Sequence, residues 1–104
     1  MRAGEWIARA QPEAPERLVA RVCEVLATNP KAKQMDVAEA LLDAADALIR
    51  LVLREGRDPV RERALDLLAA DACVTWAFEA AADDPDTLGA RARETMQRLQ
   101  QVVA

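Results

Sequence analysis

Three carboxylates on one predicted helix are the first residues of this chain that could do chemistry. Glu39, Asp43 and Asp46 are spaced four and three residues apart, which places them on one face of a helix. Clustered carboxylates can hold Mg²⁺ and so support phosphate chemistry in a helical bundle. The same residues, however, lie opposite an apolar face, near the end of the helix whose dipole favours acids. We therefore predict a solvated acidic face, with a metal-dependent, phosphate-processing all-α enzyme as the alternative.

The residue types that are missing exclude most other catalytic sites. The chain has no histidine, serine or tyrosine, and only two cysteines. Histidine-based triads, histidine-containing di-iron sites and nearly all zinc sites are therefore excluded. Its three glycines form no phosphate-cradling loop. We expect no cofactor, and a non-enzymatic role is favoured.

A second charged cluster is basic and surrounds the predicted connection between two helices. Its members are Arg50, Arg54, Arg57, Arg61 and Arg63. Positive charge suits a helix C-terminus, so surface ion pairs explain the cluster, and an anion-facing surface is the alternative. The net charge of −4 argues against a nucleic-acid binder. The helix that follows is also too apolar to read a groove, so nucleic acid is not an expected partner.

The two cysteines, Cys23 and Cys73, are far apart in the sequence. In a helical chain without an export signal, such a pair is typical of reduced thiols that fill a core. The alternative is a redox-sensing disulfide between two helices.

The composition predicts one small all-α domain. The 104 residues are 52% hydrophobic but only 3% aromatic, and β-branched residues never alternate as they do in strands. There is no apolar export segment, and no run of 18 apolar residues that could cross a membrane. We expect a cytoplasmic protein without a membrane partner, folded as a single domain over residues 1–104.

Proline and glycine divide the chain into an N-terminal arm and an antiparallel bundle. Residues 1–14 form a short helix or arm, and residues 15–103 form the bundle of four main helices. The main helices are predicted at 15–28, 36–55, 59–82 and 85–102. Asp36 with Glu39 resembles a capping box, and Gly56 marks a stop. The last helix has one narrow apolar stripe, typical of packing along a single seam: Leu88, Ala92, Met96, Leu99 and Val103.

The most informative segment is 67–82, read LLAADACVTWAFEAAA. Its polar residues Asp71, Thr75 and Glu79 recur every four positions and form one narrow line on a helix. All other sides are apolar or small, so several neighbours must cover this helix. A chain this short has few helices with which to do so.

Three interpretations of this helix stay open. The polar line faces solvent in a self-sufficient bundle, or part of the helix is an interface with a second copy or another protein. In the third, Asp71, Thr75 and Glu79 are buried in a functional polar pocket with arginine partners. We favour the interface, and predict a homodimeric interaction module acting as an adaptor, accessory subunit or inhibitor. The predicted interface residues are Trp76, Phe78, Cys73, Ala77 and Ala80, with Trp6 and Ile7 of the arm as cover.

Overall fold

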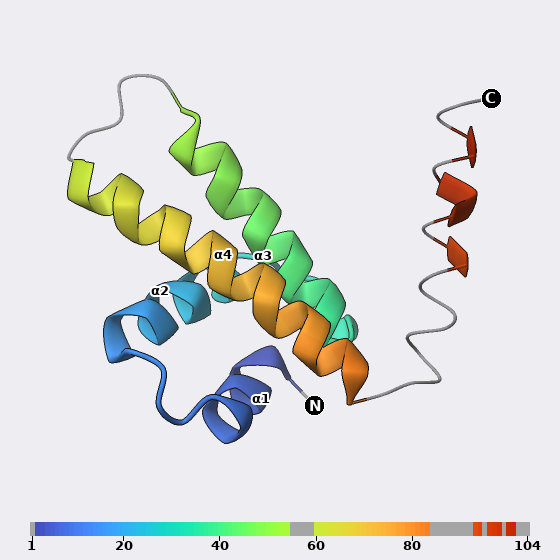
Figure 1. The fold of residues 1–104 in the computed structure, drawn as a ribbon, viewed down its shortest axis with the longest axis horizontal. Coiled ribbons are helices and arrows are strands. Elements are labelled where there is room, and N and C mark those ends of the chain that lie inside the picture. The colour runs from blue at the N-terminus through green and yellow to red at the C-terminus, as the bar shows by residue number, and fades with distance from the viewer. Residues whose placement is uncertain (1, 55–59, 84–92, 95, 99, 102–104) are drawn as a thin grey trace.

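The computed structural model describes residues 2–54, 60–83, 93–94, 96–98 and 100–101. The helices are α1 (Ala3–Ala10), α2 (Glu16–Ala27), α3 (Val37–Val52) and α4 (Val60–Ala82), with a short 3₁₀ turn, η1 (Ala32–Gln34), before α3 (Figure 1). The described residues contain no strand, and the predicted all-α bundle is confirmed. Those described between 93 and 101 are helical and belong to the last predicted helix. The rest of that helix, Gly56 and Arg57 lie outside the described residues.

The local signals at α2 and α3 explain where these helices begin. The Asp36 side chain accepts a hydrogen bond from the Glu39 backbone N–H at 2.9 Å, so the predicted cap is confirmed. Pro15, the predicted first residue of this helix, is instead the N-cap of α2, which begins one residue later at Glu16; the Pro15 carbonyl accepts a hydrogen bond from the Val19 N–H at 3.0 Å. The N-terminal arm is an ordered helix, α1, which ends just before Pro12.

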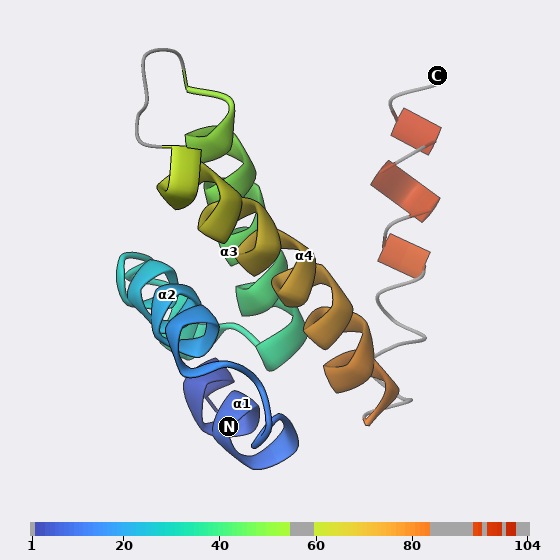
Figure 2. The same cartoon turned by 60° about the vertical axis from the view of Figure 1, so that its left-hand side comes forward.

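The two longest helices, α3 and α4, form an antiparallel pair, and this is the most extensive helix contact in the described chain. Helices α1 and α2 both lie against one side of the pair (Figures 1 and 2). The core therefore sits between the α3–α4 pair and the two N-terminal helices. None of the described helices is long and apolar enough to cross a membrane.

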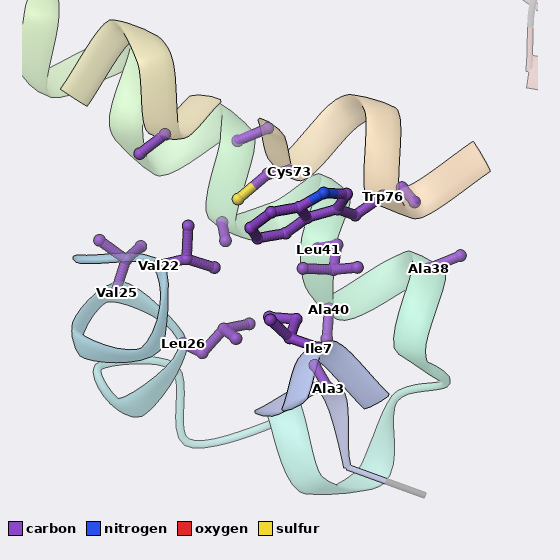
Figure 3. Close-up of a cluster of buried hydrophobic side chains, with 14 of the residues drawn as sticks. Ala3, Ile7, Val22, Val25, Leu26, Ala38, Ala40, Leu41, Cys73 and Trp76 are labelled. Atoms are coloured by element: carbon purple, nitrogen blue, oxygen red, sulfur yellow. The ribbon is translucent and has the colours of Figure 1, made fainter. Parts of the chain in front are cut away.

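Half of the described buried apolar residues are alanines, so a few larger side chains must fill the remaining space. Trp76 and Cys73 project from α4 toward Ile7 of α1 and Leu41 of α3, which are fully buried (Figure 3). Val22 of α2 closes the same cluster. Alanine lets helices approach closely, and the Trp76 ring occupies the space that the alanines leave.

The buried carboxylate of α4 is Asp66, at 1% exposure, and not the predicted polar line. The Arg21 side chain of α2 donates to Asp66 from Nε at 2.7 Å and from Nη2 at 3.3 Å. This two-pronged contact, mainly its hydrogen bonding, raises the pKa of Arg21. The sequence placed Asp66 on a polar face with Glu62. Asp66 can be buried because its charge is paired with an arginine on another helix. Only the tertiary structure reveals this partner.

The alternative of a buried polar pocket at Asp71, Thr75 and Glu79 is wrong. All three side chains are exposed, because the side of α4 that faces the core is the one carrying Asp66, Cys73 and Ala77. Glu79 accepts a hydrogen bond from the Gln11 side chain, and Trp6 Nε1 donates to Asp83 at 3.3 Å. Glu79, the last residue of the polar line, and Asp83, one turn later, therefore connect α4 to α1 and the residue that follows it.

We expect Asp66→Ala to lower the free energy of unfolding by about 3 kcal/mol, because it leaves the Arg21 guanidinium without its buried partner. This value is at the lower end of the range of about 3–5 kcal/mol for breaking a buried ion pair, because 24% of the Arg21 side chain is exposed to water. Asp71→Ala, an exposed carboxylate on the same helix, is the matched control and should change stability by less than about 0.5 kcal/mol. Urea unfolding measures both, and equal effects would contradict the structural role of Asp66.

Candidate interaction surface

The apolar residues that α1 and α2 leave uncovered form two strips on neighbouring helices. Leu42, Ile49 and Leu53 are spaced seven and four residues apart on α3, so they share one side of that helix. Val60, Leu67 and Phe78 are spaced seven and eleven apart on α4 and also share one side. All six side chains are exposed to solvent, and Phe78 is 70% exposed. We call these six residues the outer face.

Both strips, apart from Leu53, point away from α1 and α2. On α4, Glu79 and Asp83 contact α1, and at 100° per residue they lie roughly 100–150° around the helix from the Leu67–Phe78 strip. On α3, Ala47 and Leu51 line a cleft with Val25 of α2, on the side roughly opposite Leu42 and Ile49, and Leu53 at the end of the strip reaches the edge of this cleft. The outer face is therefore the side of the antiparallel pair that the N-terminal helices do not cover.

Most of the predicted interface residues belong instead to the chain's own core. Trp76, Cys73 and Ala77 of α4 are buried, as are Trp6 and Ile7 of α1, while Ala80 is half-buried. The small residues Ala70, Cys73 and Ala77 of α4 pack in the core of their own chain. A partner could reach only Phe78 among the larger side chains of that set. Sequence reasoning missed Leu42 and Ile49 as surface residues, because it assigned them to one wide apolar face of α3, and it did not consider Leu53.

The acidic cluster gives no support to a metal site. Glu39, Asp43 and Asp46 are all exposed, and Asp46 accepts a hydrogen bond from Arg50 Nε at 2.9 Å. Within the ranges that the structure describes, no group of three or more acidic or cysteine side chains could hold a metal ion. The arrangement is that of a solvated helix face.

The described members of the arginine cluster are at the surface, where Arg50 is paired with a carboxylate. Arg50 pairs with Asp46 one turn earlier, and such exposed pairs contribute about 0.3–0.5 kcal/mol. Arg54, Arg61 and Arg63 are exposed, and Arg57 lies outside the described residues. An open cleft of about 820 Å³ lies beside Arg21, Arg50 and Arg54, but two of these already bind Asp66 and Asp46. An anion-facing role for this cluster stays a prediction.

Both cysteines are free thiols within or beside the core. Cys73 is fully buried, and burial, with a smaller contribution from nearby Cys23, raises the pKa of its thiol to about 12. Burial also raises the pKa of Cys23, which is half-buried. Since the thiolate is the reactive form, this environment suits core packing better than redox sensing.

We expect Trp76→Ala to reduce the stability of the single chain by about 3–5 kcal/mol, because it empties the centre of the core. Phe78→Ala removes another α4 aromatic ring, but from the surface, and should cost less than about 1 kcal/mol. Thermal unfolding at low protein concentration separates the two. A small loss for Trp76→Ala would contradict its placement in the core.

Iodoacetamide should label native Cys73 about a thousandfold more slowly than the same residue in urea at pH 8. A pKa of about 12 in place of 9.0 reduces the thiolate fraction by roughly that factor. Cys23, which is half-buried, is the internal control and should react first. Peptide mass spectrometry over time gives both rates, and rapid native labelling of Cys73 would argue against its burial.

Comparison of the chain with protein-family models, curated proteins and solved structures finds no match to any of them. A functional conclusion must therefore come from the side chains and surfaces of this molecule.

Proposed function

We propose that this chain is a small protein-interaction module that forms a homodimer through the outer face. The observation that carries the proposal is the exposure of six large apolar side chains side by side on α3 and α4. Contiguous apolar surface on this scale is uncommon on monomeric proteins and usually marks a contact site. Adaptor, accessory subunit and inhibitor are the roles that such a module serves.

A second copy is the occupant that fits best. A two-fold dimer is the commonest oligomer of a single chain, and it uses one surface twice. The outer face is long, because it follows the axes of two antiparallel helices. Three exposed charged residues, Asp46, Arg63 and Asp71, lie among or beside these apolar side chains, and charges of both signs allow ion pairs across a contact between copies.

The test compares two neighbouring leucines of α4. Leu67 lies on the outer face at 58% exposure, whereas Leu68 is 62% exposed but points roughly 100° away from that face. Leu67→Arg should weaken the dimer more than tenfold, because it places an unpaired charge in the contact. Leu68→Arg, which adds the same charge at equal exposure, should leave the dimer intact.

Light scattering coupled to size exclusion, over a hundredfold concentration range, reads the mass of each variant. Thermal unfolding of both variants checks that the monomer fold is unchanged, as expected for exposed positions. Dimers for wild type and Leu68→Arg with a monomer for Leu67→Arg would support the proposal. A wild-type monomer at every concentration, or equal loss in both variants, would refute it.

A further inference from the structure

One line of side chains on α4 carries a positive charge and a negative charge on either side of a leucine. Arg63, Leu67 and Asp71 follow one another at intervals of four residues, so they form a continuous ridge on the helix surface. All three side chains are exposed, and Leu67 belongs to the outer face. The charge along this ridge therefore changes from positive to negative across an apolar centre.

Neither of these two charges is paired inside the single chain. Arg63 and Asp71 lie two ridge positions apart, about 12 Å along the helix axis, which is too far for an ion pair between them. Within the part of the chain that the structure describes, neither residue forms an ion pair. Asp46, the third charge beside the outer face, is already paired with Arg50 at 2.9 Å. Arg63 and Asp71 are therefore available to a second molecule.

This order of charges is self-complementary under two-fold symmetry. A two-fold dimer uses the same residues on both copies, so residue i contacts residue j and j contacts i. When two ridges lie antiparallel with Leu67 beside Leu67 of the other copy, Arg63 of each copy reaches Asp71 of the other. Two ion pairs then flank a central apolar contact. Ridges of this spacing pack together when two helices cross at about 50°, which is the commonest class of helix packing.

Other antiparallel registers along the same ridge lose these contacts. A shift by one ridge position places Leu67 beside a charged residue of the other copy, which is Asp71 or Arg63 depending on the direction. A shift by two positions places two copies of Asp71, or two copies of Arg63, beside each other, and like charges in contact are unfavourable. The register centred on Leu67 pairs both charges and places leucine beside leucine.

We propose that the homodimer forms by antiparallel packing of α4 on α4 of the second copy, with Leu67 at the two-fold axis and reciprocal ion pairs between Arg63 and Asp71. This inference rests on the proposed homodimer, and it names the helix and the register with which the second copy occupies the outer face. The charges also select the orientation of the partner, because parallel packing would place like charges side by side.

The test reverses the two charges in separate full-length variants. In a dimer of Arg63→Asp, each contact holds two carboxylates, and in a dimer of Asp71→Arg, each contact holds two guanidinium groups. Both variants should therefore dimerise about tenfold more weakly than wild type. A dimer of one Arg63→Asp chain with one Asp71→Arg chain has opposite charges in both contacts. An equimolar mixture should therefore form a mixed dimer at concentrations where each variant alone is largely monomeric.

Native mass spectrometry identifies the mixed dimer, because the two variants differ in mass, and light scattering measures the dimer fraction. Salt gives a second readout, since screening should strengthen the dimer of each single variant and weaken the mixed dimer. The matched control is Arg61→Asp, the same charge change at an exposed position roughly 120° around the helix from Leu67. This control should dimerise as wild type does, and it should form no favoured mixed dimer with Asp71→Arg. Thermal unfolding checks that every variant is folded.

The outcomes separate this inference from the proposal beneath it. A mixed dimer that forms in preference to both single-variant dimers supports the register, and misfolding of a variant cannot produce it. If Leu67→Arg disrupts the wild-type dimer but neither charge reversal does, the homodimer stands and the register is overturned. If both reversals weaken the dimer and their mixture gains no mixed dimer, the two charges do not meet, and the register is again overturned. A wild-type monomer at every concentration overturns both the homodimer and the register.

Discussion

The alanine-lined contact between α3 and α4 is the interaction on which the rest of the structure depends. Among the residues that the structure describes, nine of the 18 buried apolar residues are alanines, and eight of these nine are on α3 and α4. Small side chains bring the helix axes close together, but they bury little area per residue. The core therefore relies on a few large groups, chiefly Trp76, Ile7, Leu41 and Leu48, contributed by three helices. Helices α1 and α2 bring the remaining apolar cover to one side of the pair only.

That arrangement explains why so much large apolar surface remains outside. Helix α4 is apolar or small around most of its circumference, and a neighbour can cover only part of it. The alanines face inward, where the close approach of α3 requires them, so Leu67 and Phe78 face outward. The outer face thus follows from the same packing that forms the core. A surface required by packing and left uncovered in the single chain is a natural place for a second molecule.

The polar contacts have a positioning role. Arg21 and Asp66 tie α2 to α4, while Trp6 with Asp83 and Gln11 with Glu79 tie α1 to the end of α4. An ion pair this close to the core contributes little net stability when intact, but it fixes which helices meet and in which register. All three contacts hold the N-terminal helices on the same side of α4. They therefore help to decide which apolar strip remains free.

The sequence by itself determined the helices, most of their ends and the absence of common catalytic chemistry. These features depend on local spacing: the Asp36 cap, the proline breaks, and the lack of histidine, serine and tyrosine. Which side of each helix is buried depends on neighbours far apart in the chain, so only the tertiary structure could decide it. It placed Trp76, Cys73 and Ala77 inside, and Asp71, Thr75 and Glu79 outside. The burial of Asp66 could not be predicted from the sequence, because its partner, Arg21, is 45 residues away. For a helix apolar on nearly every side, periodicity cannot distinguish the core from a binding surface, because both are made of the same residues.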